Sequence, residues 1–119
     1  MVEEKSKTDG YIAAKRFLRD YPQWLLILKA SVIEAERTKG EFAGAWVLEE
    51  AKKMGVGWFP NLRPLVSSGI LERTGIARGG RRAYYLMRDV EGVKEAVREL
   101  QTAALTPERI KIVEENHGR

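Results

Sequence analysis

The chain of 119 residues contains no cysteine and one histidine, and these absences exclude several kinds of chemistry. Without cysteine there are no disulfides, thiolate zinc sites or thiol nucleophiles. The single histidine, His117, is two residues from the end of the sequence, so we expect it in a frayed tail rather than in a catalytic site. No group of acids has the spacing of metal ligands. We therefore expect no enzyme activity, metal, cofactor or small-molecule ligand.

The sequence also lacks a long apolar run. The longest, Trp24–Leu28, is too short to span a bilayer, and the first ten residues contain acids where a secretory signal would be apolar. We therefore expect a cytoplasmic protein without a membrane partner. The length of the chain indicates one domain over residues 9–119, preceded by a mobile arm over residues 1–8.

One segment of the chain is almost without acids. Residues 58–88 carry six lysines and arginines against one acid, whereas residues 1–57 carry ten against nine and residues 89–119 carry five against seven. All six cations of the middle segment are arginines, whose planar guanidinium suits phosphates and guanine edges. This pattern indicates a polyanionic partner, although a solvated basic face would give the same composition.

Apolar residues recur at helical spacing through the first half of the chain. The pattern predicts one helix over residues 9–21 that begins at an Asp9 cap, and a second over residues 22–39 that ends at Gly40. A third helix is predicted over residues 43–54. The second helix is the most hydrophobic, so we expect it at the centre of the core.

A glycine-containing turn over residues 55–57 leads to a fourth predicted helix over residues 58–68. Two helices joined by so short a turn indicate a helix-turn-helix over about 43–68. The apolar residues of the fourth helix fall on one side, and its other side is small and almost uncharged. Such a side is typical of a helix that lies close against another surface.

The rest of the chain predicts a hairpin and further helices. Two strands, within about 70–87, flank the turn at residues 77–80, with Tyr85 and Met87 on the buried side. C-terminal helices are predicted over about 90–116, the first capped by Asp89. An apolar seam on that helix packs either inside one chain or between two copies. Its members are Val93, Val97, Leu100 and Ala104.

The stretch WFPNLRPLVSSGILERTGIARGGRRAYYLMRD, residues 58–89, resembles the recognition helix and wing of PadR-like and other archaeal winged-helix transcription regulators. The resemblance lies in the aromatic-proline-x-leucine-arginine start, the glycine and apolar pair that leave the helix, and the arginine-rich, double-tyrosine return strand. It implies a mainly α fold with a small β-hairpin wing, a winged helix-turn-helix with additional N- and C-terminal helices. It also implies a regulator that binds double-stranded DNA as a homodimer, without catalysis.

In this interpretation the helix over residues 58–68 enters the major groove of DNA. Asn61 is expected to read adenine, and Arg63 to contact phosphate or guanine. Ser67 and Ser68 are expected to reach base edges or phosphates. A single strong base-reading side chain predicts modest sequence specificity.

The wing, residues 77–82, is expected to reach an adjacent minor groove or its phosphates. Its three cations are Arg78, Arg81 and Arg82. Lys52 and Lys53 either contact a phosphate or serve only as cations at a helix C-terminus. Tyr84 either contacts the DNA backbone or packs into the core.

Two other functions remain open at this point. A winged helix can serve as a protein–protein interaction module or as an accessory subunit of a nucleic-acid machine. The single Arg-Gly-Gly at residues 78–80 also fits an RNA-binding protein, but RNA-binding tracts usually repeat that motif.

Overall fold

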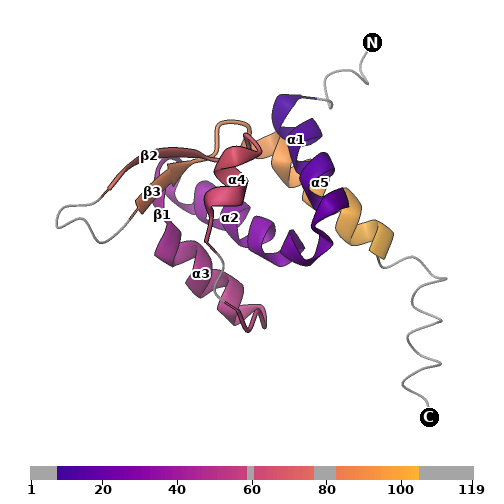
Figure 1. Cartoon of the computed structure of the whole chain (residues 1–119), viewed down its shortest axis with the longest axis horizontal. Helices are drawn as coiled ribbons and strands as arrows, with labels where there is room; N and C mark the ends of the chain where they lie inside the picture. Colours follow the sequence, from indigo (N-terminus) through magenta and orange to yellow (C-terminus); the bar gives the residue numbers. More distant parts are fainter. Residues whose placement is uncertain (1–7, 59–60, 77–82, 105–119) are drawn as a thin grey trace.

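Figure 1 shows the order and arrangement of the helices and the small sheet. The computed structural model describes residues 8–58, 61–76 and 83–104. Its helices are α1 (Asp9–Asp20), the 3₁₀-helix η2 (Pro22–Trp24), α2 (Leu25–Thr38), α3 (Gly44–Lys53), α4 (Arg63–Ser67) and α5 (Val90–Ala104). Its strands are β1 (Phe42–Ala43), β2 (Glu72–Ile76) and β3 (Ala83–Leu86). The fold is mainly helical with a small antiparallel sheet, as the sequence predicts.

Three helices, α1, α2 and α5, form what we call the body of the molecule. α5 packs against both α1 and α2, and α1 and α5 lie side by side (Figure 1). Val93 and Val97 of the predicted seam are buried, and Leu100 packs against the same core. These three residues therefore pack within one chain. The side chain of Ala104 lies outside the described residues.

The beginnings of α1 and α5 share one carboxylate. Asp89 Oδ2 accepts a hydrogen bond from the amide of Gly10 at 2.9 Å, and Oδ1 accepts one from the amide of Gly92 at 3.1 Å. A Cβ atom on either glycine would overlap this carboxylate, so the approach requires glycine at both positions. The predicted Asp89 cap is confirmed. The cap of α1 is Thr8 rather than Asp9, because the Thr8 hydroxyl accepts from the amide three residues on.

A second polar contact joins α1 to α5 further along. The Tyr11 hydroxyl donates to Glu99 Oε1 at 2.6 Å, and Lys15 Nζ donates to the same oxygen at 3.1 Å. These two donors lower the pKa of Glu99, because they stabilise its ionised form. The body is thus held by polar contacts at its surface as well as by its apolar core.

The sheet has three strands in the order β1-β3-β2, of which the sequence predicted only the hairpin pair. β1 is two residues long, and its Phe42 lies opposite Tyr85 of β3. A strand of that length has no periodicity to detect. The pairing of β2 with β3 shifts register between Arg73 and Gly75. Tyr85 and Met87 are buried, as predicted.

The second helix, predicted over residues 22–39, is divided in the structure. Residues from Pro22 form η2, in which the amide of Trp24 bonds to the carbonyl of Tyr21, and α2 follows. α2 ends because Lys39 takes a left-handed conformation, with φ of 59°, so Lys39 and not Gly40 makes the reversal. Lys39 also donates its amide to the last turn of α2.

The fourth helix is much shorter than the predicted range 58–68, since α4 has five residues. Two local features explain its late start. Asn61 Oδ1 accepts from the amide of Arg63 at 2.7 Å, which turns the chain just before the helix. Pro64 lacks an amide hydrogen and fits only a first helical turn. Leu62 and Leu65 are buried and attach this short helix to the core.

Candidate nucleic-acid interface

The surface of α4 presents small polar groups and one cation. Arg63, Pro64 and Ser67 are exposed, whereas Ser68 is half-buried. The Ser68 hydroxyl donates to the carbonyl of Leu65 at 3.0 Å, so its proton is already used within the helix. α4 therefore offers Arg63 at its first residue and Ser67 near its end as the side chains most available to a ligand.

Asn61 lies just before α4 and is exposed. Its side-chain oxygen is engaged by the amide of Arg63, so the oxygen helps to start the helix. A bidentate contact with adenine needs both the oxygen and the amino group of an asparagine. Adenine reading by Asn61 stays a prediction, and it would compete with this local hydrogen bond.

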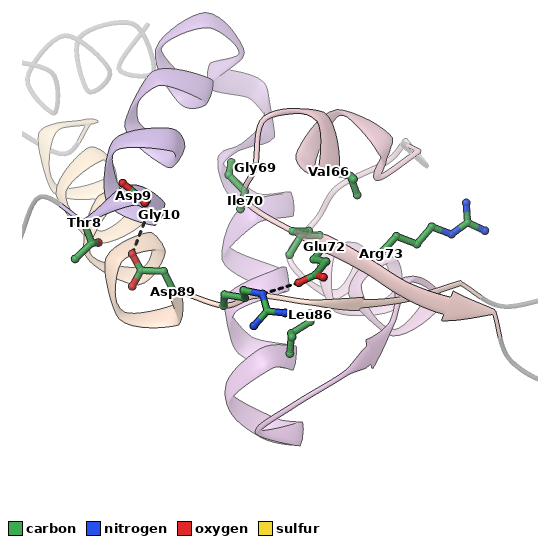
Figure 2. A pocket seen from close by; sticks show the side chains of 12 residues that line it. Thr8, Asp9, Gly10, Val66, Gly69, Ile70, Glu72, Arg73, Leu86 and Asp89 are labelled. Carbon is green, nitrogen blue, oxygen red and sulfur yellow. Dashed lines mark hydrogen bonds and ion pairs between the residues drawn. The ribbon is translucent and has the colours of Figure 1, made fainter.

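Two arginines, Arg73 on β2 and Arg88 in the turn after β3, have different surroundings. Arg88 Nε lies 2.6 Å from Glu72 Oε1, and Glu72 is the single acid of residues 58–88. Arg73 is exposed and pairs with no acid among the described residues. Figure 2 shows its side chain leaving β2 on the side where Val66 of α4 lies, away from the Glu72–Arg88 pair. Arg73 thus adds an open positive charge beside α4.

The last turn of α3 adds two lysines, Lys52 and Lys53, both exposed. Lys53 Nζ is 3.9 Å from Glu50, a loose contact, and Lys52 has no ion pair with a described residue. Both suit the negative end of the helix dipole, so a structural explanation still holds for them. We use the name basic side for these three exposed cations, Lys52, Arg63 and Arg73, which come from α3, α4 and β2.

The wing residues Arg78, Arg81 and Arg82 lie outside the described residues, but the strands that lead to them are described. On β3, Tyr84 meets Trp46 of α3 edge to face, with ring centroids 5.9 Å apart. Arg37 of α2 lies 5.4 Å from the Trp46 ring centroid. Tyr84 is half-buried against Trp46, which ties the base of the hairpin to α3, and its contact with DNA stays a prediction.

A groove of about 450 Å³ separates the end of α4 from α1. Ser67 and Ser68 line one wall, and Asp9 and Asp20 stand on the opposite wall beside Arg16. The two acids would repel a phosphate in this groove. The two ends of α4 therefore have different surroundings. Arg63 at its start belongs to the basic side, whereas Ser67 and Ser68 at its end face the two acids across the groove.

The sequence alone does not single out Arg73 as a residue of this surface. The sequence shows its charge but not its neighbours, because the register between β2 and β3 decides which arginine meets Glu72. That register includes the shift after Arg73. The sequence does show that residues 58–88 contain one acid and six arginines. Because one acid can pair with only one arginine, most of these arginines have no acid partner within the segment.

Comparisons with protein-family models, curated proteins and solved structures gave no match. None of the helices in the described part of the chain has the length and apolar character needed to cross a membrane. Within the same residues, no three acids or histidines are grouped as metal ligands would be.

Proposed function

We propose that this chain is a winged helix-turn-helix transcription regulator that binds duplex DNA mainly through phosphate contacts. The order α2, α3, α4 and then the β2–β3 hairpin is the order that the resemblance to winged-helix regulators implies. In this assignment α4 is the recognition helix and residues 77–82 are the tip of the wing.

The observation that carries the proposal is the open positive charge of the basic side. Glu72, the single acid of residues 58–88, forms an ion pair with Arg88. Arg63 and Arg73 form no ion pair with an acid among the described residues. Arginine side chains that are not paired with an acid are available to bind the phosphates of a DNA backbone. Arg78, Arg81 and Arg82 add three further cations to the same segment.

We place the DNA against the first residues of α4, because Arg63 stands there and the acids of α1 stand at the other end. Recognition helices contact base edges with their N-terminal residues, so Arg63 is in position for guanine or phosphate. Arg73 and Lys52 then contact phosphates on either side. Ser67 and Ser68 contribute little in this arrangement, since Asp9 and Asp20 lie across the groove from them.

Salt dependence of DNA binding tests the proposal. Labelled duplex DNA is titrated with the protein at several salt concentrations, and the slope of log affinity against log salt is measured by fluorescence anisotropy. Each lost phosphate contact reduces the slope by about 0.9, so Arg81→Ala with Arg82→Ala should reduce it by about 1.8. Arg63→Ala should weaken binding about tenfold, the scale of one specific arginine contact.

Arg88→Ala is the matched control, because Arg88 belongs to the same segment but is paired with Glu72. Its slope should equal that of the wild type. Negligible duplex affinity, or a slope near zero for the wild type, would remove DNA binding as the function. Equal losses for Arg63→Ala and Arg88→Ala would show that pairing does not decide which arginines bind.

A second candidate function, recognition of another protein, is favoured by one observation. The large apolar side chains exposed in the described part of the chain are Ile12, Tyr21 and Trp58. Tyr21 lines a groove of about 360 Å³ with Trp24 and Pro64, and Trp58 packs edge-on against Trp24. Exposed apolar patches are typical of protein interfaces. If this function is correct, the protein should bind a specific protein partner and should not bind duplex DNA.

A further inference from the structure

A buried carboxylate in α2 takes no part in the basic side. Glu34 lies among the core residues of α2, and its side chain is 5% exposed. A charge in such a place is costly unless it is paired. Its partner is Arg37, one turn later, whose Nε donates to Glu34 Oε1 at 3.0 Å. Nη2 of the same guanidinium donates to the same oxygen, so the acid holds the guanidinium through both nitrogens.

The same guanidinium also contacts an aromatic ring. Arg37 Cζ lies 5.4 Å from the centroid of the Trp46 ring, within the range of a cation–π interaction. Trp46, in the first turn of α3, meets Tyr84 of β3 edge to face. Tyr84 also pairs with Ala43 of β1. A continuous line of contacts therefore runs from the buried acid of α2, through α3, to the strand that follows the wing.

We infer that Arg37 is a positioning residue for the wing, because it holds Trp46 and Trp46 holds Tyr84 at the base of the hairpin. Residues 77–82 can bind the same duplex as Arg63 only if the hairpin keeps one direction relative to α3 and α4. A hairpin that is already held loses less conformational freedom when it binds. The effect on DNA binding rests on the proposed function, whereas the effect on β3 does not.

The position of Arg37 has a simpler explanation that a substitution can separate. Arg37 lies in the last turn of α2, where any cation suits the helix dipole. A lysine would keep that charge and could still pair with Glu34. It lacks the planar guanidinium that donates from two nitrogens to one acid and contacts a ring at the same time. Arg37→Lys therefore keeps the dipole effect and removes the positioning.

Amide hydrogen exchange, measured residue by residue without DNA, tests whether Arg37 holds β3. Arg37→Lys should speed the exchange of β3 amides about two- to fivefold, the scale of one exposed cation–π contact. The amides of α5 should exchange as in the wild type, whereas a general loss of stability would speed both. Arg98→Lys is the matched control, because Arg98 pairs with Glu95 at the same spacing but within α5. It should leave β3 unchanged.

Removal of the ring tests whether Arg37 acts through Trp46. Trp46→Leu should speed β3 exchange about two- to tenfold, the scale of a lost aromatic pair, and Arg37→Lys should add nothing in that background. Trp46→Phe keeps a ring and should recover part of the protection. Additive effects of Arg37→Lys and Trp46→Leu would overturn the inference. Equal β3 exchange in Arg37→Lys and Arg98→Lys would overturn it as well.

Duplex titration then tests the consequence for the wing. Arg37→Lys should weaken DNA binding about two- to fivefold, the same factor by which β3 is loosened, and Arg98→Lys should not weaken it. Unchanged affinity of Arg37→Lys, with a wild type that binds, would overturn its role for the wing. A wild type without duplex affinity would instead remove the proposed function, and the exchange rates would still decide whether Arg37 holds β3.

Discussion

The body and the basic side of the molecule differ in what their charged groups face. In the body, Lys94 Nζ lies 2.7 Å from Glu36, and Lys15 shares Glu99 with a tyrosine hydroxyl. On the basic side, Arg63 and Arg73 are exposed and have no acid partner among the described residues. The paired charges of the body thus join its helices, whereas Arg63 and Arg73 are not paired with a described acid. Three substitutions test this division, from the largest expected effect to the smallest.

The first substitution removes the apolar anchor of the basic side. Leu65 of α4 is completely buried, so Leu65→Ala should lower the free energy of unfolding by about 2 to 5 kcal/mol. Chemical denaturation measures this loss. Ser67→Ala, on the exposed surface of the same helix, should change stability by less than about 0.5 kcal/mol. A small loss for Leu65→Ala would mean that α4 is not held by its core contact.

The second substitution acts inside the body, where α1 and α5 begin. Asp89→Ala removes the carboxylate shared by α1 and α5 and should lower stability by about 1 to 2 kcal/mol, the range for a lost helix cap. Asp89→Asn keeps a capping oxygen and should recover part of the loss.

Stability should also depend on pH through this group. Burial by itself would raise the pKa of Asp89, but hydrogen bonds from Thr8 and from the amides of Gly92, Gly10 and Tyr11 lower it below its ordinary 3.8. A lowered pKa means that the stabilisation is fully present above 3.8 and is lost as the pH falls through the folded value. The difference between wild type and Asp89→Asn should therefore shrink in acid. A constant difference down to the lowest pH that the fold tolerates would contradict this role of the charge.

The third substitution removes a surface contact of the body. Glu99→Gln leaves the shape but removes the charge that faces Lys15, and it should lower stability by less than about 1 kcal/mol. High salt should reduce the difference further, because the side chains are partly exposed. Glu95→Gln is the control, since Glu95 pairs with Arg98 inside α5 alone. A larger loss for Glu95→Gln would show that the contact between helices is not the important one.

The elements with strong periodicity were predictable from the sequence. α3, α5 with its Asp89 cap, and the inward positions Tyr85 and Met87 all follow from spacing and capping rules. β1 could not be predicted, because two residues have no period and Phe42 becomes a strand only by pairing with β3.

The start of α4 shows a different kind of error. Asn61 and Pro64 are both local signals for a helix start, but the apolar residues before them continue the helical spacing and suggested a longer helix. The sequence predicts base reading by Asn61, whereas its side-chain oxygen forms the turn before α4. The pairing of Glu72 with Arg88 rather than Arg73 depends on strand register, which composition does not contain. The wing residues lie outside the described residues, so their predicted contacts remain predictions.

The carboxylate of Asp89, shared by α1 and α5, restricts the substitutions that positions 10, 89 and 92 accept during evolution. Any side chain added at Gly10 or Gly92 would collide with that carboxylate, and losing the carboxylate would leave both glycine amides without their acceptor. A mutation at one of these three positions is therefore tolerated best when the others change with it. In an alignment of related chains, positions 10, 89 and 92 should vary together or not at all.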